Sequence, residues 1–282
     1  MSKKNLFGNI VKDNRLRSEF VEPPFTVLDT RLSNWQKQKN KWKNLGIKSE
    51  VGRDVASLHM DTMNKKQNTI RHTSIFDPYL CEVLYTWFVP KEGKILDPFA
   101  GGSVRGIVAN CLGYDYTGID VRQEQIDSNI EQGKQIIPEH VPNWILGDSN
   151  KVLDTLNDSF DFIFSCPPYF NLEVYSDLDD DISNTKDYNK FITLYESIIG
   201  KSVKLLKENC FACFVVGEVR NKDGNYVGFI PDTINIFKKF GMKYYNEAVL
   251  LLPVASASMR AKNNMVNKKL CKIHQNILIF KK

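Results

Sequence analysis

The segment from Asp97 to Ser103 combines an acid, a proline and a glycine pair in the order Asp-Pro-Phe-Ala-Gly-Gly-Ser. It ends a short apolar run and precedes an expected helix, for which Ser103 is the predicted N-cap. Glycines allow positive φ and close approach of the backbone to a ligand, and free amides at a helix N-terminus suit a carboxylate. The turn therefore predicts a ligand-binding loop. Its candidate contacts are Asp97, Phe99, Ala100, Gly101, Gly102 and Ser103.

Two further acids stand at the ends of the next two apolar runs. Asp120 lies about 20 residues beyond Gly102, a separation at which an acid can accept hydrogen bonds from ribose hydroxyls. Asp148 follows the next run and can accept a hydrogen bond from an adenine amino group. The Gly-x-Gly-x-x-Gly pattern of nicotinamide enzymes is absent, because the turn reads Phe-Ala-Gly-Gly-Ser-Val-Arg-Gly. Together these features predict an adenosyl ligand, and an ordinary crossover turn is the alternative.

A second candidate site begins where the apolar run Phe160 to Ser165 ends in Cys166, Pro167, Pro168 and Tyr169. Prolines end a central strand and stiffen the backbone, so they can hold hydrogen-bond acceptors in place. An amino nitrogen on a nucleic-acid base is a poor nucleophile, and acceptors directed at its N–H groups favour the nucleophilic form. Tyr169 offers an aromatic face to a base that has left the duplex stack. The tetrapeptide thus predicts chemistry on an exocyclic amino group.

The elements that must position these residues alternate between apolar runs and helical stretches from Phe76 onward, which indicates an α/β domain with a largely parallel sheet. Doubly wound sheets bind ligands beyond the carboxyl ends of their strands, where both candidate sites fall. The helix candidates are Ser103 to Leu112, Gln123 to Gln135 and Tyr188 to Leu206. The seven strand candidates are Lys94 to Asp97, Tyr114 to Asp120, Trp144 to Gly147, Phe160 to Ser165, Phe211 to Val216, Tyr244 to Leu252 and Gln275 to Phe280.

The two motifs together resemble those of the DNA amino-methyltransferases, which combine a Phe-x-Gly-Gly cofactor motif with an (Asp/Asn/Ser)-Pro-Pro-(Tyr/Phe) catalytic motif. The resemblance extends over residues 73–282. Thr73 to Pro78 is similar to the segment that helps to hold the methionine part of the cofactor, and His274 to Asn276 is similar to the family's C-terminal end. The whole chain is similar to phage and prophage methylases of this group. The resemblance implies a Rossmann-like class I methyltransferase fold with a seven-stranded, mostly parallel sheet.

The same resemblance implies S-adenosylmethionine as the cofactor and gives each matching position a role. The residues expected to hold the cofactor are Thr73, Phe76, Phe99, Gly101 and Gly102, with Asp120 at the ribose and Asp148 at the adenine. The residues expected to act on the target base are Cys166, Pro167, Pro168 and Tyr169. The short stretch between the two motifs leaves no room for a separate recognition domain, so the base sequence must be recognised by other parts of the chain.

Cys166 departs from the family pattern, which has Asp, Asn or Ser at this position. A thiol is a weaker acceptor than a carboxylate, and Cys is closest in size to Ser. Since Ser goes with the N4 amino group of cytosine in this family, cytosine is favoured, and the N6 amino group of adenine stays open. The alternative is attack of the Cys166 thiolate on C6 of cytosine, as in C5-methyltransferases, but those enzymes place the cysteine after the proline.

The composition, 42% hydrophobic and 25% charged over 282 residues, is typical of a globular protein. The N-terminal residues lack the apolar region of a secretory signal, and the longest apolar runs are too short to span a bilayer. Six cysteines without framework spacing indicate reduced thiols. We therefore expect a cytoplasmic protein with no membrane segment. Methyl transfer needs no metal, and no paired histidine spacing indicates one.

Residues 1–70 form a predicted basic extension ahead of the catalytic domain, residues 71–282, because they are rich in Lys, Arg, Asn and Gln and lack strand-like runs. Within them, Arg31 to Gly46 predicts a basic helix with Trp35 and Trp42 on one face. This helix either contacts nucleic acid through its cations or docks its two tryptophans on the catalytic domain, and both roles are compatible.

The net charge of +5, concentrated near both ends of the chain, suits a polyanionic partner. Two loop-like segments are candidates for DNA contact, with exposed connecting loops as the alternative. Their candidate residues are Arg220, Lys222, Arg260, Lys262, Lys268 and Lys269. The sequence thus predicts an S-adenosylmethionine-dependent methyltransferase acting on a flipped base of double-stranded DNA. An RNA base amino-methyltransferase and a catalytically silent nucleic-acid-binding relative are the alternatives.

Overall fold

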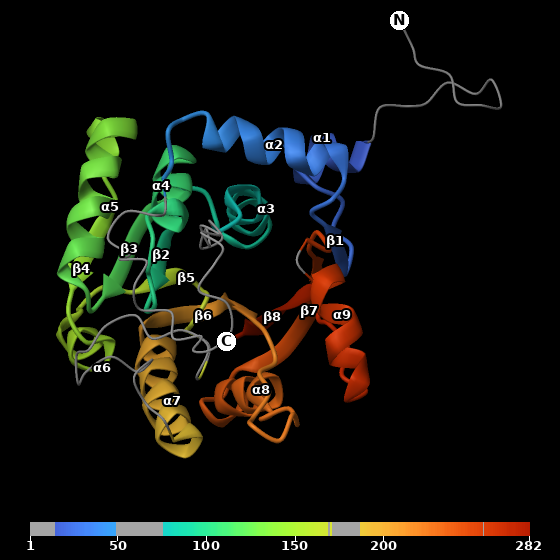
Figure 1. Ribbon diagram of the computed structural model, residues 1–282. Coiled ribbons are helices and arrows are strands. Elements are labelled where there is room, and N and C mark those ends of the chain that lie inside the picture. The colour runs from blue at the N-terminus through green and yellow to red at the C-terminus, as the bar shows by residue number, and fades with distance from the viewer. Residues whose placement is uncertain (1–14, 49–75, 169, 171–186, 256) are drawn as a thin grey trace, which may run out of the picture.

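The computed structural model describes residues 15–48, 76–168, 170, 187–255 and 257–282, which form one eight-stranded sheet flanked by helices (Figure 1). The order across the sheet is β1-β7-β8-β6-β5-β2-β3-β4. Neighbouring strands are parallel except for the pairs that β8 makes with β6 and β7. The strands are β1 (Val27–Asp29), β2 (Lys94–Asp97), β3 (Asp115–Asp120), β4 (Asn143–Leu146), β5 (Phe160–Ser165), β6 (Leu206–Val216), β7 (Lys243–Leu251) and β8 (His274–Lys281).

All seven predicted strands are present, but the predicted number is wrong by one, because the N-terminal extension adds β1 at the edge of the sheet. Strand β1 pairs in parallel with β7, and Leu28 lies opposite Leu250. The amide of Thr30 donates to the carbonyl of Leu251 over 3.1 Å at the end of the pairing. A three-residue strand is too short to give an alternating hydrophobic pattern, so periodicity alone does not reveal it.

The helices cover both faces of the sheet (Figure 1). They are α1 (Arg15–Phe20), α2 (Ser33–Lys43), α3 (Pro78–Phe88), α4 (Val104–Cys111), α5 (Gln123–Ile136), α6 (Ser149–Val152), α7 (Tyr188–Leu205), α8 (Phe229–Lys239) and α9 (Ala257–Val266). A hydrophobic core lies on each face of the sheet, and side chains of β5 point alternately into the two cores. Phe162 and Phe164 pack with residues of α3 and α4, and Ile163 packs with residues of α7 and α8. Among the described helices, none combines the length and apolar character that a bilayer span requires.

Both tryptophans of α2 pack on the rest of the fold, as one of the two interpretations of the sequence predicts. Trp35 is buried, packs edge to face on Tyr79 and donates a 3.1 Å hydrogen bond to the carboxylate of Asp77. Trp42 donates to the carboxylate of Glu82 over 2.6 Å. Asp77 also caps the N-terminus of α3, so its hydrogen bond with Trp35 links α2 directly to the start of α3.

The carboxyl ends of the parallel strands lie at one end of the sheet. Between β2 and β5 the order in which successive strands are added to the sheet reverses. Strands β2, β3 and β4 follow one another to one side of this point, and β5 and β6 lie to the other side. Such a switch point is where doubly wound sheets bind their ligands. Both predicted motifs begin here, because the glycine turn follows β2 and the tetrapeptide follows β5.

Candidate active site

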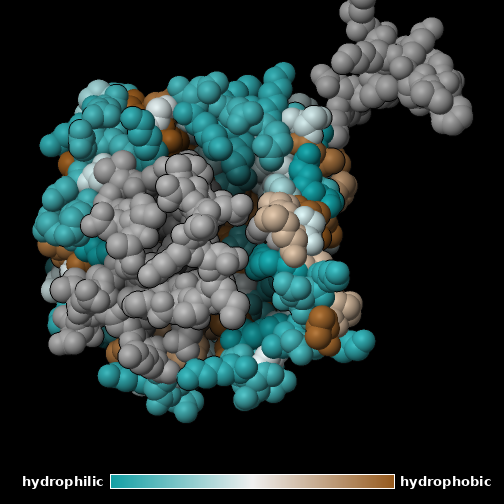
Figure 2. All heavy atoms as spheres, in the orientation of Figure 1, coloured by the Kyte–Doolittle hydropathy of each residue, from teal (hydrophilic) through white to brown (hydrophobic). Residues whose placement is uncertain are grey.

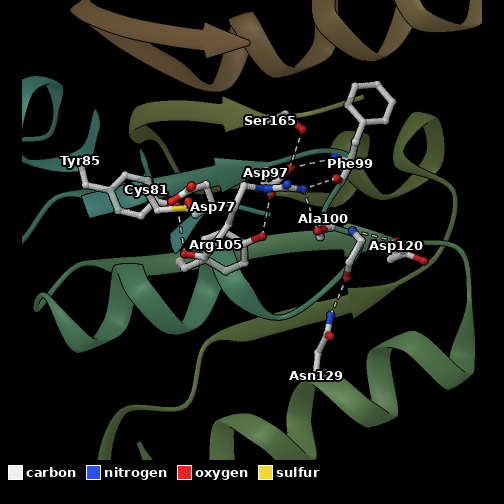
Figure 3. A network of polar contacts seen from close by, with 12 residues as sticks. Asp77, Cys81, Tyr85, Asp97, Phe99, Ala100, Arg105, Asp120, Asn129 and Ser165 are labelled. Carbon is white, nitrogen blue, oxygen red and sulfur yellow. Dashed lines mark hydrogen bonds and ion pairs between the residues drawn. The ribbon is translucent and has the colours of Figure 1, made fainter. Parts of the chain in front are cut away.

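Arg105 on α4 holds the glycine turn from inside the protein (Figure 3). Its Nε donates to Asp97 Oδ2 over 2.5 Å, and its Nη2 donates to the carbonyls of Phe99 and Ala100 over 2.7 and 2.8 Å. The guanidinium group also lies over the ring of Phe76, 4.8 Å from its centroid. Burial disfavours this charge, but the adjacent carboxylate of Asp97 outweighs it and raises the pKa of Arg105 well above its ordinary value. One side chain therefore fixes the path of the turn.

Asp97 is the centre of this network and is fully buried. Besides Arg105, its carboxylate accepts hydrogen bonds from the Tyr116 hydroxyl over 2.8 Å, the Ser165 hydroxyl over 2.6 Å and the Phe99 amide over 3.1 Å. These contacts join β2 to β3 and β5. Because these bonds connect the turn to α4 and to two neighbouring strands, we assign Asp97 the role of ordering the turn. Its predicted contact with a ligand stays a prediction.

The outer side of the turn is fixed by β3 and α5. The Gly101 amide donates to Asp120 Oδ2 over 2.9 Å, and the Gly101 carbonyl accepts from the side-chain amide of Asn129 over 2.7 Å. The Ala100 amide donates to the backbone carbonyl of Ile119 over 2.9 Å. Gly101 has a φ of +51°, and in the described part of the chain no atom beyond its sequence neighbours lies within 4 Å of the position that a β-carbon would take. The turn therefore needs glycine for its conformation and leaves free space beside it.

Gly118 on β3 permits the close approach of the turn to the sheet. A β-carbon at this position would lie 2.8 Å from the Ala100 side chain and 2.6 Å from the ring of Tyr116. Such distances are too short for real contacts, so a larger residue would push the turn away from β3. The predicted ribose ligand Asp120 follows two residues later on the same strand, with a side chain that is 12% exposed.

Asp148 follows β4 and caps the short helix α6, with its Oδ1 accepting a hydrogen bond from the Asn150 amide over 2.9 Å. The neighbouring Ser149 hydroxyl donates to the carbonyl of Pro98 over 2.6 Å. This bond ties the α6 turn to the glycine turn. Asp97, Asp120 and Asp148 thus stand at the carboxyl ends of three adjacent strands, as the sequence predicts.

The tetrapeptide lies beside the glycine turn because β5 pairs with β2. Ser165 ends β5, and its hydrogen bond to Asp97 links the two motifs directly. Cys166 is half-buried against the core that contains Phe164, and the ring of Phe76 packs on Phe164 at 5.8 Å. Pro167 is buried and Pro168 is half-buried. The predicted residues Thr73 and Tyr169 lie outside the described residues.

Ser103 occupies the N-cap position of α4, but its hydroxyl makes no capping hydrogen bond, so the predicted cap is wrong in this respect. The Ser103 side chain is buried and donates to Gln132 Oε1 over 3.2 Å. The same oxygen accepts from the backbone amide of Lys48 over 2.7 Å. Ser103 is therefore linked through Gln132 to α5 and to Lys48. Its contact with a cofactor stays a prediction.

Sequence reasoning missed Arg105, Asn129, Gly118 and Ser165, all of which position the two motifs. Arg105 carried a detectable signal, since it is the single charged residue in α4, whose other side chains are mostly apolar or small. Asn129 and Ser165 are ordinary polar residues in a helix and a strand. Their roles depend on partners 28 and 68 residues away in the chain.

The two predicted DNA-contact segments extend from the same edge of the sheet, after β6 and β7. Arg220 lies over the ring of Tyr226 at 4.0 Å and donates to the Gly224 carbonyl over 2.6 Å. The second segment was expected to be a loop, but residues 257–266 form α9. Its Ala, Met, Arg and Lys residues have high helix propensity, which explains the difference. The exposed cations of the two segments are Lys222, Arg260, Lys262 and Lys268.

Comparison with known proteins gives no match to a family model or to a curated protein. Several solved structures are similar to the chain at low sequence identity. TrmN from Thermus thermophilus is 12% identical with a TM-score of 0.49 and covers 73% of this chain, which spans 49% of the TrmN chain. A precorrin-6y C5,15-methyltransferase from Geobacter metallireducens is also 12% identical, with a TM-score of 0.48 and coverage of 74% and 90%.

A TehB-like SAM-dependent methyltransferase from Corynebacterium glutamicum is 17% identical, with a TM-score of 0.44, and the match covers 88% of this chain and 97% of that protein. At these TM-scores the likenesses say nothing about the reaction. The mostly parallel sheet agrees with the fold expected from the sequence, with eight strands in place of seven. The chain has a Rossmann-like α/β fold.

Proposed function

We propose that this protein transfers a methyl group from S-adenosylmethionine to an exocyclic amino group of a base in DNA. One observation carries the proposal furthest: the hydrogen bond from Ser165 to Asp97 joins the glycine turn to the Cys-Pro-Pro segment at the switch point of the sheet. A cofactor motif and a base-binding motif thus share one internal network. A methyl donor and its acceptor must meet in this way for an in-line transfer.

The residues along β2, β3 and β4 fit an adenosyl cofactor. The space beside Gly101 can receive a ligand close to the backbone, since a β-carbon there would meet no atom of the described residues within 4 Å. Asp120 ends β3 and Asp148 follows β4. In this proposal they accept hydrogen bonds from the ribose and from the adenine, as the resemblance implies. When bound, S-adenosylmethionine supplies an activated methyl group on a sulfonium. The chain's own contribution is to bind and orient this group.

The Cys-Pro-Pro segment orients the acceptor in this proposal. Pro167 and Pro168 restrict the backbone of the segment, so in this proposal it holds carbonyl acceptors in place for the N–H groups of a base. Acceptors there and at Cys166 would hold the amino nitrogen with its lone pair toward the donor. Held in this way, the amine nitrogen would form an N–CH₃ bond, the S–CH₃ bond of the donor would break, and one proton of the amine would pass to solvent.

To test this proposal, the purified chain is incubated with methyl-labelled S-adenosylmethionine in two separate reactions. One contains unmethylated duplex DNA, and the other contains total RNA. Label in DNA supports the proposal. Label in RNA alone assigns the protein to an RNA base methyltransferase. If the chain binds nucleic acid but calorimetry detects no binding of S-adenosylmethionine, the protein is a nucleic-acid-binding relative without catalytic activity. At a cofactor concentration below saturation, the Asp120→Asn variant should incorporate less label than the parent chain.

A further inference from the structure

The connection between β7 and β8 carries an unusual combination of charge and apolar exposure. Between Pro253 and Ile273 the connection contains no Asp or Glu. Its cations are Arg260, Lys262, Lys268, Lys269 and Lys272. This excess of positive charge favours a polyanionic partner.

Large apolar side chains are exposed in the same connection. Met259 is 77% exposed, Val266 is 76% exposed and Leu270 is 70% exposed. Met259, Lys262 and Val266 are spaced at i, i+3 and i+7, so they share one face of α9. Figure 2 shows hydrophobic residues among hydrophilic ones where α9 lies in Figure 1. Exposed apolar groups that gather in one place indicate an interaction surface.

The connection is folded onto the sheet and onto itself. The Leu252 amide donates to the Ile273 carbonyl over 2.9 Å, which closes the connection at its base. The Lys269 amide donates to the Asn264 carbonyl over 2.9 Å, and the Asn264 side chain donates to Cys271 Sγ over 3.1 Å. The returning chain is therefore held against the end of α9, and the exposed side chains project from an ordered support.

The turn after β6 lies against this connection and extends its surface. A β-carbon at Gly224 would come within 2.3 Å of Lys269 Nζ, which shows how closely the two segments approach. Beside Gly224, Arg220 stacks on Tyr226, whose side chain is 52% exposed. We call the combined set the α9 surface. Its members are Arg220, Lys222, Tyr226, Met259, Lys262, Val266, Lys268, Lys269 and Leu270.

We propose that the α9 surface docks duplex DNA beside the target base, with its cations on the phosphates and Met259, Val266 and Leu270 against sugars and base edges. The proposal rests on the proposed function for the choice of DNA. Charge complementarity favours a nucleic acid, and the surface lies at the sheet edge from which the Cys166 segment also extends. Apolar side chains set among cations are used by proteins that open or bend a duplex.

The test measures binding of full-length protein to a labelled duplex of about two helical turns (about 20 base pairs) by fluorescence anisotropy over a range of salt concentrations. The charge variant is Lys262→Gln with Lys268→Gln. We expect its affinity to fall at least about fivefold and its log–log salt slope to decrease in magnitude by about 2, because two phosphate contacts are lost.

The apolar variant is Met259→Ser with Val266→Ser. We expect it to lose about fivefold in affinity with an unchanged salt slope, because it removes groove contacts and no charge. The matched control is Lys204→Gln with Lys238→Gln, which removes two exposed charges from the C-terminal ends of α7 and α8. We expect this control to bind as the parent chain does. Circular dichroism and thermal melting verify that all variants are folded.

Each result supports or overturns the α9 surface. Equal affinity of the charge, apolar and control variants would overturn it. Preferential binding to vesicles of phosphatidylserine and phosphatidylcholine, or self-association that the apolar variant abolishes, would replace DNA by another partner and overturn it as well. Loss of DNA binding in both variants supports the surface even if the parent chain transfers no methyl group, so the two proposals can fail separately.

Discussion

The two halves of the sheet edge differ in how their polar side chains are used. In the half formed by β2, β3 and β4, polar side chains form hydrogen bonds that fix the glycine turn. These side chains are Asp97, Arg105 and Asp120. Beyond β6 and β7, Lys222, Lys262 and Lys268 are exposed, and apolar side chains stand among them. In our proposals the first half binds one small ligand and the second contacts DNA. Substitutions in the first half should therefore change stability or cofactor binding, and those in the second should change DNA binding alone.

The largest effect is expected at Arg105. Arg105→Ala leaves the buried Asp97 carboxylate and two backbone carbonyls without their donor, and removal of one partner from a buried ion pair costs about 3–5 kcal/mol. Urea denaturation should show this loss of unfolding free energy, together with loss of cofactor binding. Arg31→Ala is the control, because Arg31 pairs with Asp29 at an exposed site, and it should leave stability nearly unchanged. Equal effects of the two variants would contradict the role of Arg105.

Gly101→Ala separates backbone strain from ligand contact. Forcing a side chain into the left-handed region costs about 1–2 kcal/mol, and the new methyl group would also occupy the free space beside the turn. Gly46→Ala is a matched control, since Gly46 has a φ of +94° and equally open surroundings, in a loop after α2. Both variants should lose similar stability in urea, and only Gly101→Ala should weaken cofactor binding in calorimetry. If both bind cofactor normally, the free space is not the ligand site.

Asp120→Asn tests the ribose position with little change in shape. The amide retains an acceptor for the Gly101 amide but removes the charge, so we expect the affinity for S-adenosylmethionine to fall about tenfold (about 1.4 kcal/mol). Isothermal titration calorimetry measures this change. Asp127→Asn on the exposed side of α5 provides the comparison and should bind normally. Unchanged affinity in Asp120→Asn would remove Asp120 from the cofactor site.

The smallest effect on stability is expected at Lys222, which is exposed in the turn after β6. Lys222→Gln should leave the melting temperature unchanged and weaken binding to unrelated DNA sequences to the same extent, because a phosphate contact carries no sequence information. Anisotropy titrations with two unrelated duplexes measure this. A sequence-dependent loss would instead make Lys222 a base-reading residue.

The sequence revealed those parts of the fold that repeat a local pattern. The seven longer strands show apolar runs, and the two motifs follow strands, so their meeting at one edge could be predicted from parallel topology. Strand β1 was missed because three residues carry no period. Helix α9 was missed because its polar and apolar residues show no buried stripe, although its propensities favour a helix.

The sequence predicts the two motifs of the candidate site but not the residues that hold them in place. Gly101 and Asp120 follow spacing rules, so the sequence indicates both residues of the hydrogen bond that the structure contains. Ser165 and Asn129 act through partners that are distant in the chain, and no local pattern predicts such pairs. Asp97 and Ser103 are buried, which the sequence could not distinguish from exposure at a ligand face.

The central claim is methyl transfer to an amino group of a DNA base, and nucleoside mass spectrometry tests it most directly. DNA treated with the purified protein and S-adenosylmethionine is digested to nucleosides, and the methylated products are compared with those of the Asp120→Asn variant. The account predicts N4-methylcytosine or N6-methyladenine, with cytosine favoured by the size of Cys166. The appearance of 5-methylcytosine, or of no methylated nucleoside with folded protein that binds the cofactor, would contradict it.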